Sequence, residues 1–103
     1  MPRPKNKRRI FLNPEATYFK PAGIPMRVLE EIQLGIDELE AIRLAYCLGL
    51  TQSEAAKRMN ISQPTFHRVL ESGLRKSANA LVNGKAIRIE KPKQHVKTKT
   101  RLK

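Results

Sequence analysis

The stretch LTQSEAAKRMNISQPTFHRVLESGLRK, residues 50–76, decides the fold of this chain, because it has the pattern of two helices joined by a short turn. The first helix is expected to start after Thr51, which forms a capping box with Glu54: each side chain bonds a backbone N–H of the first turn. It is expected to end at Asn60, a residue type that tolerates the left-handed conformation of a tight turn.

The second helix is expected to begin after Ser62, a favoured N-cap residue. Pro64 then falls in the first turn, where its missing N–H costs nothing. The helix should reach about Val82, because Asn83-Gly84 is a typical helix end. Its apolar residues form one stripe that should face the core, made of Phe66, Val69, Leu70, Leu74, Ala78 and Leu81.

The residues that open the second helix are polar or compact and lie mostly off this stripe. In a helix-turn-helix the second helix enters the major groove of DNA, and its first turns face the base edges. Gln63 can pair with adenine, Arg68 with guanine, and Thr65 can contact a thymine methyl group. A solvated helix surface is the alternative interpretation. The candidate DNA-binding residues are Lys57, Arg58, Ser62, Gln63, Pro64, Thr65, His67, Arg68, Arg75 and Lys76.

The net charge of +12 on 103 residues is concentrated at the two ends of the chain. Residues 1–9 carry +5 and residues 85–103 carry +7, whereas residues 10–84 sum to zero. Within that neutral body, residues 10–54 carry −4 and residues 55–84 carry +4. Basic ends on a neutral body suit a polyanion such as nucleic acid. Acidic lipids fit less well, because neither end pairs its charge with an apolar helix face; charged tails that serve only solubility remain an alternative.

A third helix precedes this pair. Ile36, Leu39 and Ile42 recur at three-residue steps, and the helix is expected to reach about Leu48. Cys47, the only cysteine, lies in this apolar stretch and is expected to be a small buried hydrophobe.

Two acidic pairs, Glu30-Glu31 and Glu38 with Glu40, could be imagined as catalytic carboxylates. Charges along an exposed helix start explain them better. No Gly-rich phosphate loop is present, and we expect no enzyme activity.

Short strands are expected near both ends of the body. RIFLN (9–13) and KAIRIE (85–90) are candidates that could pair with each other, and VLEEIQL (28–34) is ambiguous between a strand and a helical turn. TYFKPAGIP (17–25) should be an ordered irregular loop. The apolar side chains expected to pin that loop to the body are Tyr18, Phe19 and Ile24.

Several classes of protein are disfavoured. No apolar run approaches the ~18 residues of a membrane span, and the basic N-terminus lacks the apolar segment of a secretory signal, so we expect a cytoplasmic protein. The two histidines, His67 and His95, have no Cys or carboxylate at ligand spacing. We therefore expect neither a metal site nor a cofactor.

Residues 50–76 resemble the region-four helix-turn-helix of bacterial sigma factors. A closer resemblance covers roughly residues 1–90. MPRPKNKRR, TYFKPAGIP, DELEAIRL, GLTQSEAAKRMNISQPTFHRVLESGLRK and ALVNGKAIRI, in that order, resemble the small prokaryotic predicted DNA-binding proteins of uncharacterised protein family 0251. This resemblance implies a sigma-region-four-like DNA-binding domain without supplying a target. Members often carry Cys near the N-terminal basic run, which PKNKRR here lacks, so metal or cofactor sensing is not carried over.

The sequence thus predicts a mainly α fold: a helix-turn-helix with a three-helical core, short terminal strands and basic disordered tails. We expect a basic arm at 1–9, a DNA-binding domain at 10–90 and a basic tail at 91–103. The expected function is sequence-specific binding of duplex DNA, as a transcriptional regulator, with the helix after Ser62 in the major groove.

Two alternatives stay open: an RNA- or ribosome-associated protein, and a protein-interaction module that contacts RNA polymerase. A homodimer is also open, because operators with two-fold symmetry suit a lone helix-turn-helix. The candidate pairing surfaces are Tyr46, Leu48 and the 18–26 loop.

Overall fold

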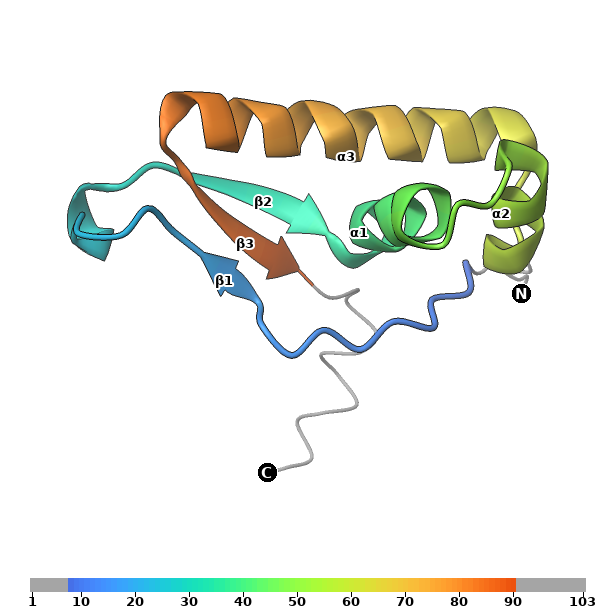
Figure 1. Cartoon of the computed structure of the whole chain (residues 1–103), viewed down its shortest axis with the longest axis horizontal. Coiled ribbons are helices and arrows are strands. Elements are labelled where there is room, and N and C mark those ends of the chain that lie inside the picture. The colour runs from blue at the N-terminus through green and yellow to red at the C-terminus, as the bar shows by residue number, and fades with distance from the viewer. Residues whose placement is uncertain (1–7, 91–103) are drawn as a thin grey trace, which may run out of the picture.

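The computed structural model describes residues 8–90, which form three helices and a small sheet (Figure 1). The predicted tail, 91–103, and residues 1–7 of the predicted arm lie outside the described residues. The elements in chain order are β1 (Tyr18–Phe19), a 3-10 helix (Met26–Val28), β2 (Glu31–Gly35), α1 (Ile36–Ile42), a π-helical segment (Arg43–Cys47), α2 (Gln52–Met59), α3 (Gln63–Asn83) and β3 (Ala86–Glu90). α3 lies across one face of the sheet, and α1 lies between the sheet and α2 (Figure 1).

The sheet has the strand order β1-β3-β2, with β3 in the centre. β3 runs antiparallel to β1 and parallel to β2, so that Leu34 lies opposite Ile89. The strand predicted at 85–90 is confirmed. The ambiguous 28–34 segment begins at the last residue of the 3-10 helix, and its residues 31–34 belong to β2. The prediction that residues 9–13 form a strand and pair with β3 is wrong.

Residues 9–13 cannot join the sheet because the helices bind their backbone. Arg9 N donates to Met59 O at 2.9 Å, and Phe11 N donates to a carboxylate oxygen of Glu40 at 3.0 Å. An N–H that is already bonded cannot donate to a strand ladder. These contacts place Arg8 beside the turn between α2 and α3.

The helix predicted from 36 to about 48 is confirmed, but the prediction of which side chains face the core is partly wrong. Leu44 is fully buried, whereas Leu39 and Ile42 are only half-buried. Cys47, predicted to be buried, is exposed. The reason is the π-helical segment: Leu48 N donates to Arg43 O, five residues back, and this wider turn rotates Cys47 out of the α-helical phase.

The apolar stripe of α3 is confirmed in its first half and wrong in its second half. Leu74, Ala78 and Leu81 are all exposed, Leu81 by 79 %, while Gly73 and Ala80 are buried. Small residues face inward there because the neighbouring elements approach the helix closely. The core itself is formed by Ala41, Leu44, Ala55, Ala56, Met59, Phe66, Val69 and Leu70.

Two glutamates predicted to lie on an exposed helix start are buried instead. Glu40 is 0 % exposed. It accepts hydrogen bonds from Phe11 N, from Arg43 Nε at 2.8 Å and from Arg43 Nη2 at 3.1 Å. A buried carboxylate of this kind is tolerated because its oxygens are bonded and a guanidinium balances its charge. Glu40 therefore joins the N-terminal segment to α1.

Glu38 is 8 % exposed and joins three elements. It accepts from Gly35 N at 2.8 Å, from Ser72 Oγ at 2.6 Å and from Lys76 Nζ at 3.0 Å. Burial opposes ionisation of this carboxyl, but the bonds from Ser72, Gly35 and Lys76 outweigh it and hold the pKa of Glu38 below its usual value.

The prediction that 17–25 is an irregular loop is wrong at its start, because Tyr18–Phe19 form β1 and pair with β3. The side chain that anchors the segment is Tyr18. Its hydroxyl donates to Glu31 at 2.8 Å, and the Arg88 guanidinium lies over its ring, 4.7 Å from the centroid. Phe19 and Ile24 are exposed, so their predicted anchoring role is wrong.

Candidate nucleic-acid interface

The turn between α2 and α3 has the local structure that its sequence predicts. Asn60 adopts the left-handed conformation, with φ 60° and ψ 43°, and Ile61 N donates to Ala56 O at 3.0 Å. Ser62 caps α3: its Oγ accepts from Thr65 N at 3.2 Å and donates to Thr65 Oγ1 at 2.8 Å. The Ser62 hydroxyl and the Thr65 hydroxyl therefore hold each other in place.

The start of α2 is fixed in the same local way. Thr51 N donates to Glu54 Oε1 at 3.0 Å, and Glu54 N donates to Thr51 Oγ1 at 3.1 Å, so the predicted capping box is confirmed. The two helices meet through side chains that are fully buried, including Ala55, Met59 and Phe66. This packing fixes α2 relative to α3 and leaves the outer side of the turn to solvent.

The first two turns of α3 present three polar side chains and one proline outward. Gln63, Pro64, His67 and Arg68 are exposed, and Thr65 is half-buried. The guanidinium of Arg68 approaches the Thr65 hydroxyl, with Nη2 at 3.5 Å. The structure thus brings these predicted site residues together on one end of one helix.

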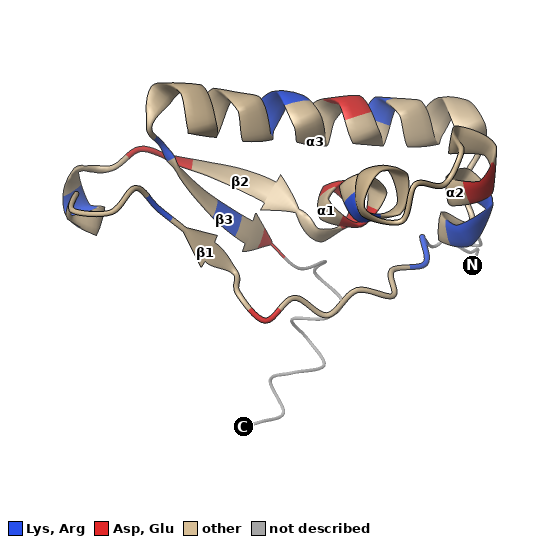
Figure 2. Cartoon of the chain, viewed as in Figure 1, with Lys and Arg blue, Asp and Glu red and all other residues tan. Residues whose placement is uncertain are grey.

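Basic residues of α2 lie at the same end of the molecule (Figure 2). Lys57 and Arg58 are exposed in the last turn of α2, as the predicted phosphate contacts require. An open groove of about 610 Å³ runs beside Lys57 along the turn. The groove is lined by Arg8, Lys57, Asn60, Ile61, Ser62 and Thr65.

Arg8 is a groove residue that the sequence did not assign to this surface. Its guanidinium pairs with the carboxylate of Asp37, and its backbone neighbour Arg9 is bonded to the end of α2. The sequence shows a basic run at 1–9, but it carries no signal for where that run meets the body.

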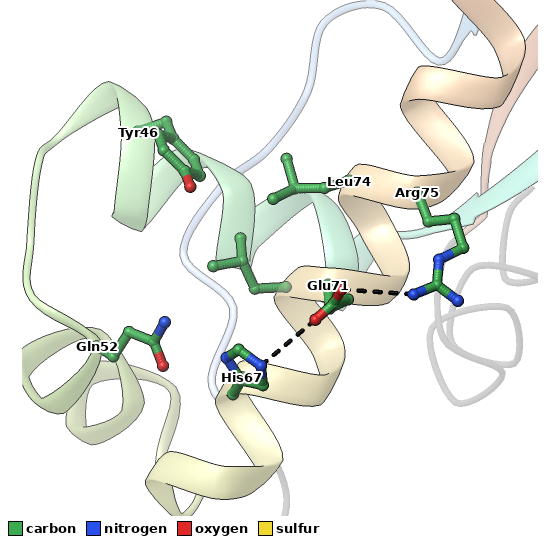
Figure 3. A pocket seen from close by; sticks show the side chains of 7 residues that line it. Tyr46, Gln52, His67, Glu71, Leu74 and Arg75 are labelled. Atoms are coloured by element: carbon green, nitrogen blue, oxygen red, sulfur yellow. Dashed lines mark hydrogen bonds and ion pairs between the residues drawn. The ribbon is translucent and has the colours of Figure 1, made fainter.

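Arg75 and Lys76, the remaining candidates, have partners within the chain. Glu71 lies between His67, whose Nε2 is 3.3 Å away, and Arg75, whose Nη2 is 3.4 Å away (Figure 3). The prediction that His67 has no carboxylate at ligand spacing is therefore wrong, because Glu71 follows it by four residues on the same helix. Lys76 pairs with Glu38 on the α1 side of α3. Arg75 therefore lies on the outer surface, whereas Lys76 is bonded to the buried carboxylate of Glu38.

Within residues 8–90, no group of three or more His, Cys, Asp or Glu side chains is arranged to hold a metal ion. None of the helices in that range has the length and apolar character needed to cross a membrane.

Comparison with known proteins shows the family. The model of the family described as "Protein of unknown function DUF134" matches residues 1–96, and the chain belongs to that family. A UPF0251 protein from Dehalococcoides mccartyi is 58 % identical over 90 residues, which cover 87 % of this chain and 77 % of the relative. The membership of family 0251 expected from the sequence is therefore confirmed.

Two further relatives carry the same family name. A UPF0251 protein from Moorella thermoacetica is 57 % identical over 87 % of this chain and 60 % of its own length. One from Caldanaerobacter subterraneus is 54 % identical over 87 % of this chain and 76 % of its own length. No solved structure matches this chain.

Proposed function

We propose that this protein binds duplex DNA in a sequence-specific manner and regulates transcription. In this proposal α2, the turn and α3 act as a helix-turn-helix of the type found in sigma factor region four. The first turns of α3 enter the major groove, which is wide enough for one helix and displays a distinct donor and acceptor pattern for each base pair.

The observation that carries the proposal is the exposure of the α3 start. Gln63 and Arg68 project from a helix end whose apolar residues, such as Phe66, are fully buried. The side chains that can read adenine and guanine therefore stand on a rigid support, and α3 does not need to move to present them.

The groove along the turn supports the phosphate contacts. Lys57 and Ser62 line it together, so a cationic side chain and a helix N-terminus face the same space. This is the combination that binds phosphate oxygens and fixes the register of a protein on the duplex. Arg8 adds a second cation to this groove, although Asp37 offsets part of its charge.

The distribution of acidic residues weakens the alternative of a protein-interaction module for RNA polymerase. That alternative drew on the −4 charge of residues 10–54. In the structure Glu38 and Glu40 are buried, and Glu31 is paired with Arg88. Less acidic surface is then available for a basic partner than the sequence indicates. An RNA target stays open. A competition assay with duplex DNA and structured RNA of equal length distinguishes an RNA target from a DNA target.

The decisive experiment separates base reading from phosphate binding. We expect Arg68→Ala to relax sequence choice by about 1–3 kcal/mol at one position, because a bidentate contact to guanine is lost. We expect Lys57→Ala to weaken binding to all sequences alike and to lower the salt slope by about 1. Selection of bound fragments from random duplexes identifies the site, and titrations of selected and random duplexes then measure both variants. Equal losses for both variants on both duplexes would refute this division of roles.

A further inference from the structure

We propose that the N-terminal segment, residues 8–13, is a second DNA-contacting element, in which Arg8 binds a backbone phosphate while Asp37 holds the Arg8 guanidinium in position. The inference rests on the proposed function and adds to it a strand contact made outside the helix-turn-helix. It assigns the groove along the turn to the sugar-phosphate backbone of one strand.

The N-terminal segment is fixed against the helices, and this brings Arg8 to the groove. Arg9 N donates to Met59 O at 2.9 Å, and Phe11 N donates to a carboxylate oxygen of Glu40 at 3.0 Å. The basic start of the described chain therefore lies beside the basic last turn of α2 (Figure 2). Arg8 does not need a rearrangement of the fold to contact a strand that lies against α2.

The groove has the chemistry of a site for the sugar-phosphate backbone. Arg8 and Lys57 line it from two different elements, so cations stand on two of its sides. Polar side chains of the turn and of the start of α3 complete it, namely Asn60, Ser62 and Thr65. None of the described residues that line the groove is acidic. Cationic and hydroxyl side chains of this kind are the usual partners of phosphate oxygens.

Asp37 leaves most of the Arg8 guanidinium available. A guanidinium carries several N–H donors in one planar fork, and Nη1 of Arg8 donates to Oδ2 of Asp37. Within residues 8–90 the Arg8 side chain makes no other hydrogen bond. Asp37 itself does not line the groove. The remaining donors of Arg8 can therefore bind a phosphate while the pair with Asp37 stays intact.

Asp37 is a firm support for Arg8 because it is itself bonded. Its Oδ1 accepts from Glu38 N at 2.8 Å, in the first turn of α1. The Arg8 side chain is 39 % exposed, compared with 26 % for Asp37. Arg8 is thus held in place and still reachable by DNA. A long side chain that is already ordered loses less entropy when it binds a phosphate.

The test pairs single protein residues with single phosphates of the selected duplex. A methylphosphonate removes the charge of one phosphate, and it is placed at each position of the binding site in turn. Fluorescence anisotropy with the wild type and Arg8→Ala gives a double-mutant cycle for each position. We expect one position where neutralisation costs the wild type about tenfold in affinity and costs Arg8→Ala less than about twofold. Lys57→Ala should couple to the same phosphate or to the next one on that strand.

Arg9→Ala is the matched control. It removes the same charge one position along the chain and keeps the bond to Met59 O, which the Arg9 backbone makes. Arg9 does not line the groove, so Arg9→Ala should leave the Arg8-coupled phosphate as costly to neutralise as in the wild type. Arg8→Ala should also lower the slope of log affinity against log salt by about 1. Circular dichroism verifies that all variants are folded.

Asp37→Asn tests the positioning role. Asparagine has the same shape and can still accept from Glu38 N, but it does not pair with a cation. We expect the coupling between Arg8 and its phosphate to fall from about tenfold to about threefold, because the guanidinium is no longer held. The salt slope should not fall, since the charge of Arg8 remains. A coupling that stays the same or increases would overturn the role assigned to Asp37, because it means that Asp37 competes with the phosphate.

Two further outcomes separate this inference from the proposed function. If Arg68→Ala relaxes sequence choice but no phosphate couples to Arg8, this inference is overturned and the proposed function stands. If the wild type binds no duplex in preference to another, both are overturned.

Discussion

Glu38 is the residue at which three parts of the fold meet. Its carboxylate bonds the start of α1 through Gly35 and the middle of α3 through Ser72 and Lys76. A carboxylate that is nine-tenths buried is stabilising only while it is ionised and fully bonded, since the bonds from Lys76 and Ser72 are made to the charged form. The position of α3 relative to α1, and with it the candidate reading surface, therefore depends on the charge of Glu38.

The stability of the protein should depend on pH through this residue. The pKa of Glu38 in the folded state lies below the value of 4.5 that the group has in an unfolded chain. The contribution of Glu38 is then fully present above pH 4.5 and is lost as the pH falls through the folded-state pKa. We expect Glu38→Gln to lower the free energy of unfolding by about 1–2 kcal/mol near pH 7, and to flatten its acid dependence.

Urea denaturation at several pH values between neutrality and about pH 3 measures both effects. Glu15→Gln is the matched control, since it removes a carboxylate from an exposed position. Parallel pH profiles for the wild type and Glu38→Gln would contradict the assignment.

The sequence could not reveal this role. Glu38 and Glu40 lie where negative charge favours a helix start, which is a sufficient local reason for them. Their burial depends on Ser72, 34 residues away, and on Phe11, 29 residues away. Nothing in the local pattern encodes contacts at that separation.

At the scale of the elements, α3 approaches α1 closely at Gly73. A Cβ added at Gly73 would lie 3.1 Å from Glu38 Cβ, 3.2 Å from Ile42 Cδ1 and 3.3 Å from the Glu38 carbonyl oxygen. Those distances are shorter than ordinary van der Waals contact, and one of the atoms is backbone. Because Gly73 has no side chain, α1 and α3 come close enough for Glu38 to bond Ser72 and Lys76.

Substitution at Gly73 should separate the two helices. Gly73→Ala gains about 1 kcal/mol of helix propensity, but we expect overpacking against α1 to cost more, about 1–3 kcal/mol. The net result should be a loss of stability that becomes larger in Gly73→Val. Chemical denaturation of the three proteins measures the series. A rise in stability of about 1 kcal/mol for Gly73→Ala would mean that α1 adjusts freely.

The elements differ in how far the sequence determines them. The caps at Thr51 and Ser62 and the turn at Asn60 were predictable, because each is made by residues within four positions of one another. The three-stranded sheet was not, since β3 pairs with strands more than 50 residues earlier in the chain. The prediction that one apolar stripe of α3 faces the core was wrong for the second half of the helix, because its large apolar residues face outward and Gly73 faces inward.

At the scale of the whole molecule, charge and structure are divided between different parts of the chain. The body from 10 to 84 is neutral, and the excess of positive charge lies at the two ends. Some acids of the body are held by bases of the body, as in the pairs Glu40 with Arg43 and Glu38 with Lys76, whereas Asp37, Glu30 and Glu31 are held by Arg8, Lys85 and Arg88 of the two ends. If the chain binds DNA as proposed, the ends supply the attraction that does not depend on sequence, and the start of α3 supplies the choice of site.

This division predicts the effect of salt. A complex that neutralises roughly 6–10 phosphates should lose about 10³–10⁵ in affinity between 50 and 200 mM salt. Removal of residues 91–103, which carry six Lys or Arg residues, should lower the slope of log affinity against log salt and weaken selected and random duplexes by the same factor. Ser at those six positions, in a chain of full length, controls for length and should act as the deletion does. Fluorescence anisotropy over a salt series gives both slopes. An unchanged slope after either change, or a loss confined to the selected duplex, would show that the basic tail is not the source of the non-specific attraction.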